Sequence, residues 1–558
     1  MKALPVPPSI HVELDGLPLD PRAVDDLISF TVEHSAGLTS KFTLQLRTWN
    51  DVTSRYSWVD DTLFTLGSKL ELLMGFGTAP RVSLIAGEVT DIELKTDANA
   101  APRLEVSGLD PRHALAREQK TRRFNEKTLG AIVRRIAGEH RLSVGNVPRA
   151  DVGSRTQYNQ TDLEFLNGLA ADHGCELVIS TAGGQKALSF QAQESGPSAT
   201  LKLGEELLEF TPRISSQSLV SKVTVRSSSP DGEEVLVESA VIRASLPSGQ
   251  KRSGLRNGKE LKARGHRIIT NRPVNSRDEA RELARAELER IVSSAVTGSG
   301  RCLGRPELRV GGTLAIKAVG NRFSGQYHLT QVTHTFSVEE GFRTAFEVQG
   351  GPRVPDSVST SKAPVQGLAV ARVNQTDEQG RVTLHIPWLA PDYVSDWVRV
   401  VTPLAGKGHG LYLPFQVDDE VLVAFEQGDI DRPFVLGGVW STQATPPDKP
   451  EGATSGEGEK RQYALRTPGG LSLWFDDKAR RITLGDGGKT QLVIDAEAGS
   501  VTLTADQDLS MKAGGALTLQ CRELSAEADQ RGSVKAAQGL ALNSSAGIKL
   551  NDGALEVV

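Results

Sequence analysis

The sequence predicts a mostly β protein with a minor helical part, ending in a rod of short strands that several chains build together. Three observations support this fold class. Apolar and polar residues alternate through about the first 110 residues, the alternation returns in a compact block over 367–440, and apolar doublets recur about every eight residues from Leu471 onward. Successive side chains of an extended strand point to opposite faces, so alternation predicts half-buried β-structure.

The first 110 residues read as an antiparallel barrel or sandwich, because runs such as Phe42–Arg47 and Lys69–Leu73 are separated by Gly and Asp. The apolar period then becomes helical over Thr128–Ala137 and Asp162–Gly174. We expect Asp162 to be the N-cap of the second helix and Gly174 to end it.

Beyond these helices, strand patterns return and one charged helix interrupts them. The helix is expected from about Arg277 to Val292. The expected strands contain Val223–Val225, Val235–Val237, Leu314–Ile316, Tyr327–Leu329 and Phe346–Val348.

Two segments rich in Pro, Ser, Thr or Gly predict linkers, at 353–366 and 441–465. The block between them, 367–440, carries about five alternating runs in some 70 residues. That size and strand number fit a small Greek-key barrel of the OB type.

The C-terminal doublets predict an assembly of three chains. A five-residue rung buries too little apolar surface to offset its ordering entropy, so rungs must stack on other rungs. A period near eight residues is too short to close a coil within one chain, which takes about 20 residues, and it suits a triangular prism with one rung per chain in each layer. The expected trimer core is Leu492, Ile494, Val501, Leu503, Leu509, Met511, Leu517, Leu519, Leu540, Leu542 and Ile548.

The small-barrel block resembles the VgrG-type spike proteins of contractile injection systems, which are relatives of phage hub and needle proteins. The matching stretches are Gly367–Trp388 and Trp397–Trp440, including Gly428-Asp-Ile-Asp-Arg-Pro433. Tyr158–Leu177 and Ser324–Phe336 resemble a hub helix and a hub strand pair of the same family.

This resemblance implies a structural spike rather than an enzyme. The implied domains are a hub β-barrel (1–110), an α/β insertion (111–200), a second hub β-barrel (201–352), an OB-fold neck (367–440) and a trimeric β-helix (466–558). The implied partners are two further copies of the chain, tube and baseplate proteins, and a PAAR-type cap, with effector cargo as a further candidate. The apolar tip residues Leu550, Leu555, Val557 and Val558 are the expected cap-docking face.

No catalytic, cofactor or metal site is expected. The chain lacks a GxSxG nucleophile elbow, a GxxxxGK[ST] phosphate loop and an HExxH zinc helix. The acidic clusters Asp418–Glu420 and Asp429/Asp431 could hold Ca²⁺ or form a carboxylate pair, but Asp429 and Asp431 are better explained as a turn before Pro433 with Arg432 paired locally. The sequence Gly485–Gly488 is better explained as a turn than as a calcium-binding repeat. Cys175, Cys302 and Cys521 include no CxxC pair, and we expect buried free thiols.

Charge and targeting signals narrow the partners further. The net charge of −5 gives no global attraction to nucleic acid or to an anionic membrane. Two basic stretches, Arg112–Arg135 and Lys251–Arg272, have no aromatic residue for base stacking apart from Phe124, and solvated faces or salt-bridged subunit contacts explain them better. The N-terminus has no continuous apolar segment, so we expect synthesis in the cytosol without a signal peptide.

The expected function is the central spike of a phage-tail-like injection machine, contacting the target membrane only on injection. Type VI secretion and a released extracellular particle both fit. Two alternatives stay open: a spike that also acts as or carries an effector, and a carbohydrate-binding or carbohydrate-cleaving β-helix protein.

Overall fold

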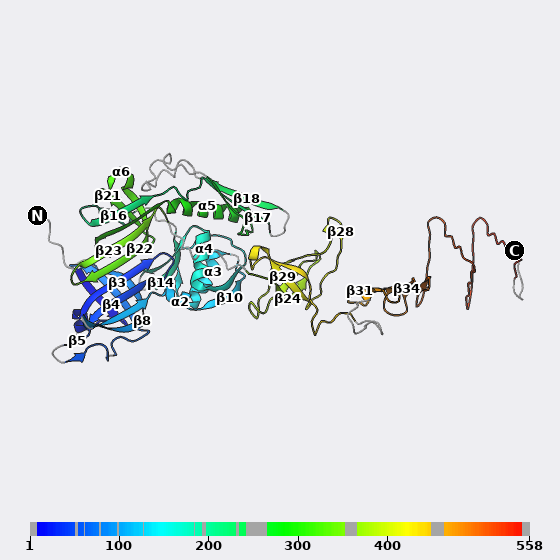
Figure 1. The fold of residues 1–558 in the computed structure, drawn as a ribbon, viewed down its shortest axis with the longest axis horizontal. Helices are drawn as coiled ribbons and strands as arrows, with labels where there is room; N and C mark the ends of the chain where they lie inside the picture. The colour runs from blue at the N-terminus through cyan, green and yellow to red at the C-terminus, as the bar shows by residue number, and fades with distance from the viewer. Residues whose placement is uncertain are drawn as a thin grey trace. The chain divides into compact units, whose positions relative to one another are not determined.

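The computed structural model describes residues 8–50, 54–60, 62–77, 80–97, 100–126, 128–182, 185–191, 197–229, 234–241, 265–351, 365–447 and 462–549. The chain divides into two compact units, 1–444 and 445–558. Most of the regular structure is β, as the sequence predicts (Figure 1). Among the described residues, none of the helices combines the length and the apolar character needed to cross a membrane.

One 13-stranded sheet dominates the first unit and joins segments far apart in the sequence. Strands β3 and β22 pair antiparallel, from Ser35 opposite Gln331 to Ser29 opposite Ser337, and so connect the early strands to the late ones. The early strands are β1 (Pro8–Leu14), β2 (Leu17–Pro18), β3 (Leu27–Ser35), β4 (Lys41–Arg47), β7 (Lys69–Phe76), β8 (Val82–Asp97) and β9 (Ala100–Leu109). The late strands are β15 (Ala199–Lys202), β16 (Leu207–Ile214), β20 (Val296–Leu303), β21 (Thr313–Lys317), β22 (Gly325–Ser337) and β23 (Gly341–Gln349).

The sheet carries two hydrophobic cores. One gathers residues of the early strands, such as Phe42, Leu44 and Leu72, and the other gathers residues of the late strands, such as Leu314 and Leu329. The loops between these strands contain four short elements: α1 (Pro21–Asp25), β5 (Trp49–Asn50), β6 (Arg55–Tyr56) and α6 (Gly320–Phe323).

A separate α/β segment lies between the early and late strands, and its helices use the predicted apolar faces. Leu129, Ile132, Val133 and Ile136 of α3 are all buried in one core with α4. The segment contains α2 (Arg112–Ala116), β10 (Gln119–Phe124), α3 (Leu129–Glu139), β11 (Ser143–Val144), β12 (Arg155–Thr161), α4 (Asp162–Asp172), β13 (Glu176–Ala182) and β14 (Gln185–Gln191).

The N-cap of α4 differs from the prediction. Thr161, not Asp162, caps the helix: the Glu164 amide donates to Thr161 Oγ1 at 3.1 Å, and the Thr161 amide donates to Glu164 Oε2 at 2.8 Å. This reciprocal capping box satisfies two amide groups at once, which a single Asp cap does not do. Asp162 becomes the first helical residue, and the helix ends just before Gly174, which has a positive φ of 66°.

The charged helix α5 (Arg277–Ser294) lies where the sequence predicts it and packs on a three-stranded sheet. We call this assembly the α5 body. Its strands are β17 (Lys222–Ser228), β18 (Val235–Val241) and β19 (His266–Ile269).

The small barrel is a five-stranded sheet in the order β25-β24-β29-β30-β26. Val382 and Val398 exchange backbone hydrogen bonds at 3.0 and 2.7 Å, which links β25 to the chain just before β26 and closes the sheet on itself. The elements are β24 (Ala369–Thr376), β25 (Val382–His385), β26 (Arg399–Val400), β27 (Ala405–Gly406), β28 (His409–Gly410), β29 (Glu420–Phe425), the 3-10 turn η1 (Glu426–Gly428) and β30 (Pro433–Gly438).

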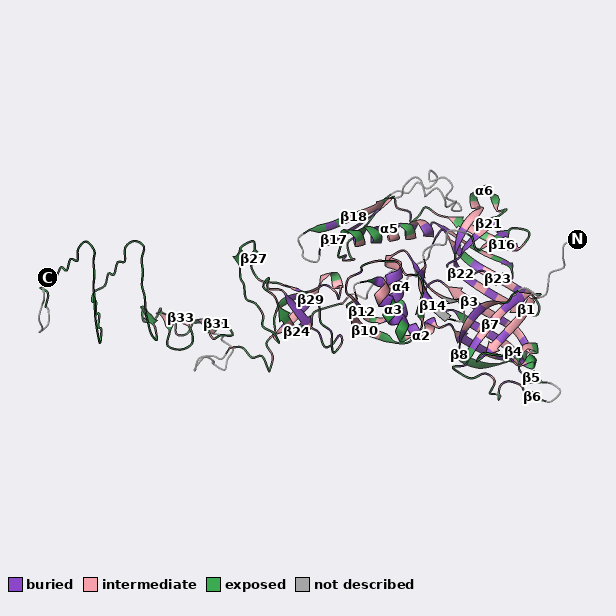
Figure 2. Cartoon of the chain, turned by 180° about the vertical axis from the view of Figure 1, so that it is seen from behind, coloured by how far each residue is buried: buried purple, intermediate pink, exposed green. Residues whose placement is uncertain are grey.

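The second unit begins with a five-stranded antiparallel meander and then continues without strands. The meander consists of β31 (Gln462–Arg466), β32 (Ser472–Asp476), β33 (Arg481–Gly485), β34 (Gln491–Asp495) and β35 (Ser500–Thr504). Within the described part of 505–549 there is no helix or strand, and nearly every residue is exposed (Figure 2).

Candidate functional site

The meander arranges the apolar doublets into two columns on one face of the sheet. Cross-strand register aligns Leu465, Leu473, Leu484, Leu492 and Leu503 in one column, and Tyr463, Phe475, Ile482, Ile494 and Val501 in the other. Directly opposed residues of antiparallel strands share a face, as do residues two apart in one strand. The ten side chains therefore form one continuous apolar face.

This apolar face is open to solvent in the single chain. Val501 is 69% exposed, Tyr463 55% and Leu503 53%. The opposite face carries polar pairs, including Arg481 with Asp495 at 2.7 Å. The Ala498 amide and the Arg481 guanidinium hold the pKa of Asp495 below its usual range. Proteins rarely leave such a contiguous apolar surface uncovered in water, which makes this face a candidate interaction site.

Three Asp-capped turns reverse the chain between the rungs. The carboxylates of Asp476, Asp486 and Asp495 accept backbone hydrogen bonds of 2.8–2.9 Å from Ala479, Gly488 and Ala498. A residue with positive φ follows in each turn: Arg480 at 48°, Gly487 at 76° and Gly499 at 66°. Asp favours such local capping and glycine adopts positive φ without strain. The stretch Gly485–Gly488 therefore belongs to a turn, in line with the simpler of the two explanations.

Two details of the first rungs differ from the sequence interpretation. Leu471 lies in the turn before β32, and the doublet of that strand is Leu473 with Phe475. Strand β31 begins at Gln462, inside the segment 441–465 that the sequence marks as a linker, and ends at Arg466. Its five residues follow a run of Gly, Glu and Lys, and a strand this short gives too few alternating positions to be predicted from the sequence.

Over 505–549, the described part after Thr504, the doublets have no strand partner in their own chain. Leu509, Met511, Leu517, Leu519, Leu540, Leu542 and Ile548 are all exposed, Leu542 by 65%. The proposed tip residues Leu550, Leu555, Val557 and Val558 lie outside the described residues. The expected pairing of these rungs between chains stays a prediction.

The acidic turn of the small barrel forms the local structure that the sequence favours. Asp429 Oδ1 accepts a hydrogen bond from the Asp431 amide at 3.1 Å, and Arg432 pairs with Glu426 at 3.2 Å. The Asp431 carboxylate accepts hydrogen bonds from Thr156, 275 residues away in the chain. Its oxygens are thus occupied by protein donors, a role that the sequence pattern does not reveal.

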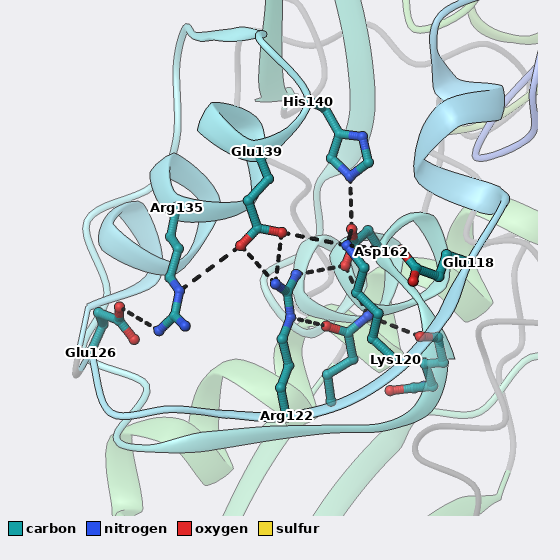
Figure 3. A network of polar contacts seen from close by, with 10 residues as sticks. Glu118, Lys120, Arg122, Glu126, Arg135, Glu139, His140 and Asp162 are labelled. Carbon is teal, nitrogen blue, oxygen red and sulfur yellow. Dashed lines mark hydrogen bonds and ion pairs between the residues drawn. The ribbon is translucent and has the colours of Figure 1, made fainter. Parts of the chain in front are cut away.

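A further cluster that the sequence does not reveal is Glu139, His140 and Asp162 (Figure 3). Asp162 Oδ2 lies 2.8 Å from both His140 Nε2 and Lys120 Nζ, and Asp162 Oδ1 accepts from Arg122 at 2.7 Å. Arg122 also binds Glu139 at 2.7 Å. These residues come from the end of α3, the start of α4 and strand β10, with no ligand-like spacing in the sequence.

The cluster is a compensated ion-pair network rather than a candidate metal centre. The side-chain cations of Lys120 and Arg122 already neutralise the carboxylates of Asp162 and Glu139, as a bound metal cation would have to do. Burial of Asp162 raises its pKa, but hydrogen bonds from Lys120, His140 and Gln157 outweigh it and hold that pKa below the usual range.

The basic stretch Arg112–Arg135 forms ion pairs within the chain, whereas the sequence interpretation expects solvated faces or contacts between subunits. Besides Lys120 and Arg122, Arg123 contacts Asp396 at 2.5 Å and Arg135 contacts Glu126 at 3.2 Å. In the second stretch, residues 251–264 lie outside the described part, and Arg267 pairs with Glu287 at 3.2 Å.

The three cysteines are free thiols, but only two are buried. Burial raises the pKa of Cys302 to about 12 and that of Cys175 to about 11, so both stay protonated. Cys521 corrects the expectation: it is exposed, because the strandless segment around it packs on nothing in its own chain.

Two family models match the chain. Residues 9–338 match the Alg8 N-terminal domain, and residues 365–440 match the type VI secretion system/phage-baseplate injector OB domain. The second match confirms the OB-type barrel that the sequence predicts.

Curated relatives and solved structures agree with the OB match. The type VI secretion system spike protein VgrG1a of Pseudomonas aeruginosa is 32% identical over 145 residues, which are 25% of this chain and 21% of the relative. The actin cross-linking toxin VgrG1 of Vibrio cholerae is 33% identical over 131 residues, 22% of this chain and 11% of the relative. A half-lidded PdpA-VgrG complex of Francisella has the same fold over 89% of this chain and 88% of its own, at 9% identity and a TM-score of 0.56.

The matched region thus covers about a fifth or less of these two curated relatives. The resemblance to VgrG-type spikes is nonetheless confirmed by the OB match and the relatives together. With its N-terminal match covering more than half of its length, this chain belongs to the family of the Alg8 N-terminal domain and carries the OB barrel of VgrG-type spikes.

Proposed function

We propose that this chain is the non-enzymatic central spike of a phage-tail-like contractile injection system, acting as a homotrimer. The observation that carries the proposal is the open two-column apolar face on the meander, followed by exposed doublets with the same spacing. Three such faces turned inward would form a closed triangular prism, which hides the apolar side chains from water.

The turns suggest that the needle has two zones. Over 462–504, Asp-capped turns reverse the chain, so each chain would supply one complete wall of the prism. After Thr504 this turn pattern stops, so successive rungs would advance around the axis and pair with other copies. The small barrel also exposes Leu404, Leu411 and Tyr412 between β26 and β29, which two neighbouring copies would cover.

The rest of the molecule takes the roles that its relatives suggest. The two halves of the 13-stranded sheet would be the hub barrels (1–110 and 201–352) that adapt a threefold spike to the tube and baseplate, and the OB barrel would be the neck. The tip residues Leu550, Leu555, Val557 and Val558 would seat a PAAR-type cap. Assembly into a particle would carry the protein out of the producing cell, by type VI secretion or in a released extracellular particle.

The direct test is the mass of the full chain in solution by light scattering. We expect a trimer. A folded monomer with a protected C-terminal unit would overturn the proposal.

Isotope-mixed crosslinking tests the two zones. Lys489 Nζ lies 3.0 Å from Asp506 in one chain, so a zero-length carbodiimide crosslink there should join peptides of the same isotope label in trimers refolded from light and heavy chains. Crosslinks from Lys512 or Lys535 should join light to heavy peptides in about half of the products, as random mixing requires. Same-label crosslinks throughout 505–549 would contradict the second zone.

An activity assay tests the first of the two alternatives, and the strand pairing argues against the second. One relative is named a toxin, so a spike with effector activity remains the second candidate, and turnover of peptidoglycan or another envelope polymer by the purified chain would favour it. A carbohydrate-acting β-helix needs parallel coils, whereas the strands β31–β35 pair antiparallel.

A further inference from the structure

We infer that the turn Asp429–Pro433 of the small barrel is the rigid coupling between neck and hub, with Asp431 and Arg432 holding two different parts of the hub. The inference rests on the proposed spike function for its purpose, because a needle driven by its hub needs a stiff joint. Its structural content rests only on contacts within residues 1–444, which form one compact unit.

Asp431 holds the α/β segment. Its carboxylate accepts from Thr156 Oγ1 at 2.5 Å and from the Thr156 amide at 3.3 Å, and it lies 3.7 Å from Arg123. Arg123 also donates to Tyr393 of the small barrel at 3.1 Å and lies over its ring. Thr156 and Tyr393 are buried, and the Arg123 side chain is 6% exposed. These contacts therefore lie inside a buried interface.

Arg432 holds the α5 body. Its guanidinium donates to the carbonyl oxygen of Ser228 at 3.0 Å and to that of Val274, and it lies 3.4 Å from Asn275 Oδ1. Arg432 is buried, and Glu426 of its own barrel balances its charge. Planar guanidinium groups suit this role, because several fixed donors meet several fixed acceptors.

The Asp431 and Arg432 contacts, which we call the two grips, start from one turn and end on the α/β segment and the α5 body. These two parts also contact each other. Arg155 pairs with Glu279 of α5, and Arg272 pairs with Asp172 of α4. The neck, the α/β segment and the α5 body therefore each contact the other two. Separating the barrel from either part would leave Asp431 and the buried Arg432 without these hydrogen-bond partners, so the docked arrangement should dominate strongly over swivelled ones.

The consequence is that loosening either grip should loosen the other. The Thr156 amide reports the Asp431 side, because its acceptor is the Asp431 carboxylate. The variant Arg432→Gln removes the other grip and does not touch Thr156 in any recorded contact.

Hydrogen exchange of the full chain tests this cross-talk. In Arg432→Gln we expect exchange at the Thr156 amide to speed up more than about tenfold, because the variant loses the buried hydrogen bonds that the guanidinium donates to the α5 body. The matched control is Asp396→Asn, which also contacts Arg123 but from a side chain that is 74% exposed, and it should change that rate less than about threefold. Unchanged exchange in strands β3 and β22 shows that the variant hub remains folded.

Two outcomes would overturn the inference. Unchanged Thr156 exchange in a folded Arg432→Gln chain means that the two contacts are independent, and equal effects of both variants mean that the buried turn has no special role. Light scattering on the same samples separates this question from the spike proposal: a monomeric wild-type chain refutes the trimer, whereas an uncoupled trimer refutes only the joint.

Discussion

Acid should weaken the junction between the early and late strands of the 13-stranded sheet through His34 and His334. These residues lie on the paired strands β3 and β22, with ring centroids 6.1 Å apart. Burial lowers the pKa of His34 to about 4 and that of His334 to about 3. Besides burial, Arg112 and Arg309 disfavour a charge on His34 while Asp110 favours it, and His334 faces His34 and Arg309.

The sign of the effect follows from proton uptake. Between pH 6.5 and 4 the unfolded chain binds protons at these imidazoles and the folded chain does not, so stability rises with pH and falls on acidification. At about 1.4 kcal/mol per pKa unit, the shift of His34 alone corresponds to a loss of about 3 kcal/mol. The two rings repel each other when charged, so the pair should lose at least about 3 kcal/mol rather than the sum of two independent shifts.

Hydrogen exchange of peptides from β3 and β22, measured between pH 7 and 4 and corrected for intrinsic rates, gives the opening free energy of this junction. The double variant His34→Asn/His334→Gln should be less stable at pH 7 but should lose much less stability on acidification. His409→Asn, at an exposed position of the small barrel, is the control and should follow the wild type. A constant difference between wild type and double variant across this pH range would refute the reasoning.

Three further predictions concern the needle, the ion-pair network and close packing. Leu492→Asp puts a charge in the middle of the apolar face and should raise the chain concentration at which the proposed trimer is half dissociated in a dilution series. The same charge at Thr502, on the opposite face, should change that concentration little. Asp162→Asn leaves Lys120 and Arg122 without their buried partner, so the α/β segment should lose about 2–4 kcal/mol in urea unfolding; a loss below about 0.5 kcal/mol would contradict the network. Gly108→Ala should destabilise the 13-stranded sheet by more than about 2 kcal/mol, because the new Cβ would lie 2.2 Å from the Glu88 carbonyl oxygen. In Gly130→Ala the new Cβ in α3 meets nothing within 4 Å, so this variant should stabilise the α/β segment by up to about 1 kcal/mol. Thermal unfolding measures both changes.

Local periodicity accounts for what could be read directly from the residues. The charged helix, the strand runs, the five strands of the small barrel and the doublets at Ile482/Leu484, Leu492/Ile494 and Val501/Leu503 all appear where the alternation places them. Each of these depends on neighbours within a few positions, because the side-chain period of a strand or helix is a local property.

Contacts over long sequence separations could not be read in this way. Nothing in the residue pattern pairs Gln331 with Ser35 or brings Glu139 to Asp162. Nor does it predict that Asp431 contacts the α/β segment while Arg432 contacts the α5 body. The Thr161 cap was also missed, because Asp162 is an equally good capping residue and only the geometry of Glu164 decides between them.

The amino-acid sequence by itself therefore determined which segments are strands or helices, which side of each strand is apolar, and that the C-terminal rungs cannot bury that side alone. The tertiary structure decided which distant strands share a sheet and which buried charges face each other, because those choices depend on chain closure and mutual desolvation across the whole fold. A pattern of neighbours does not contain that information.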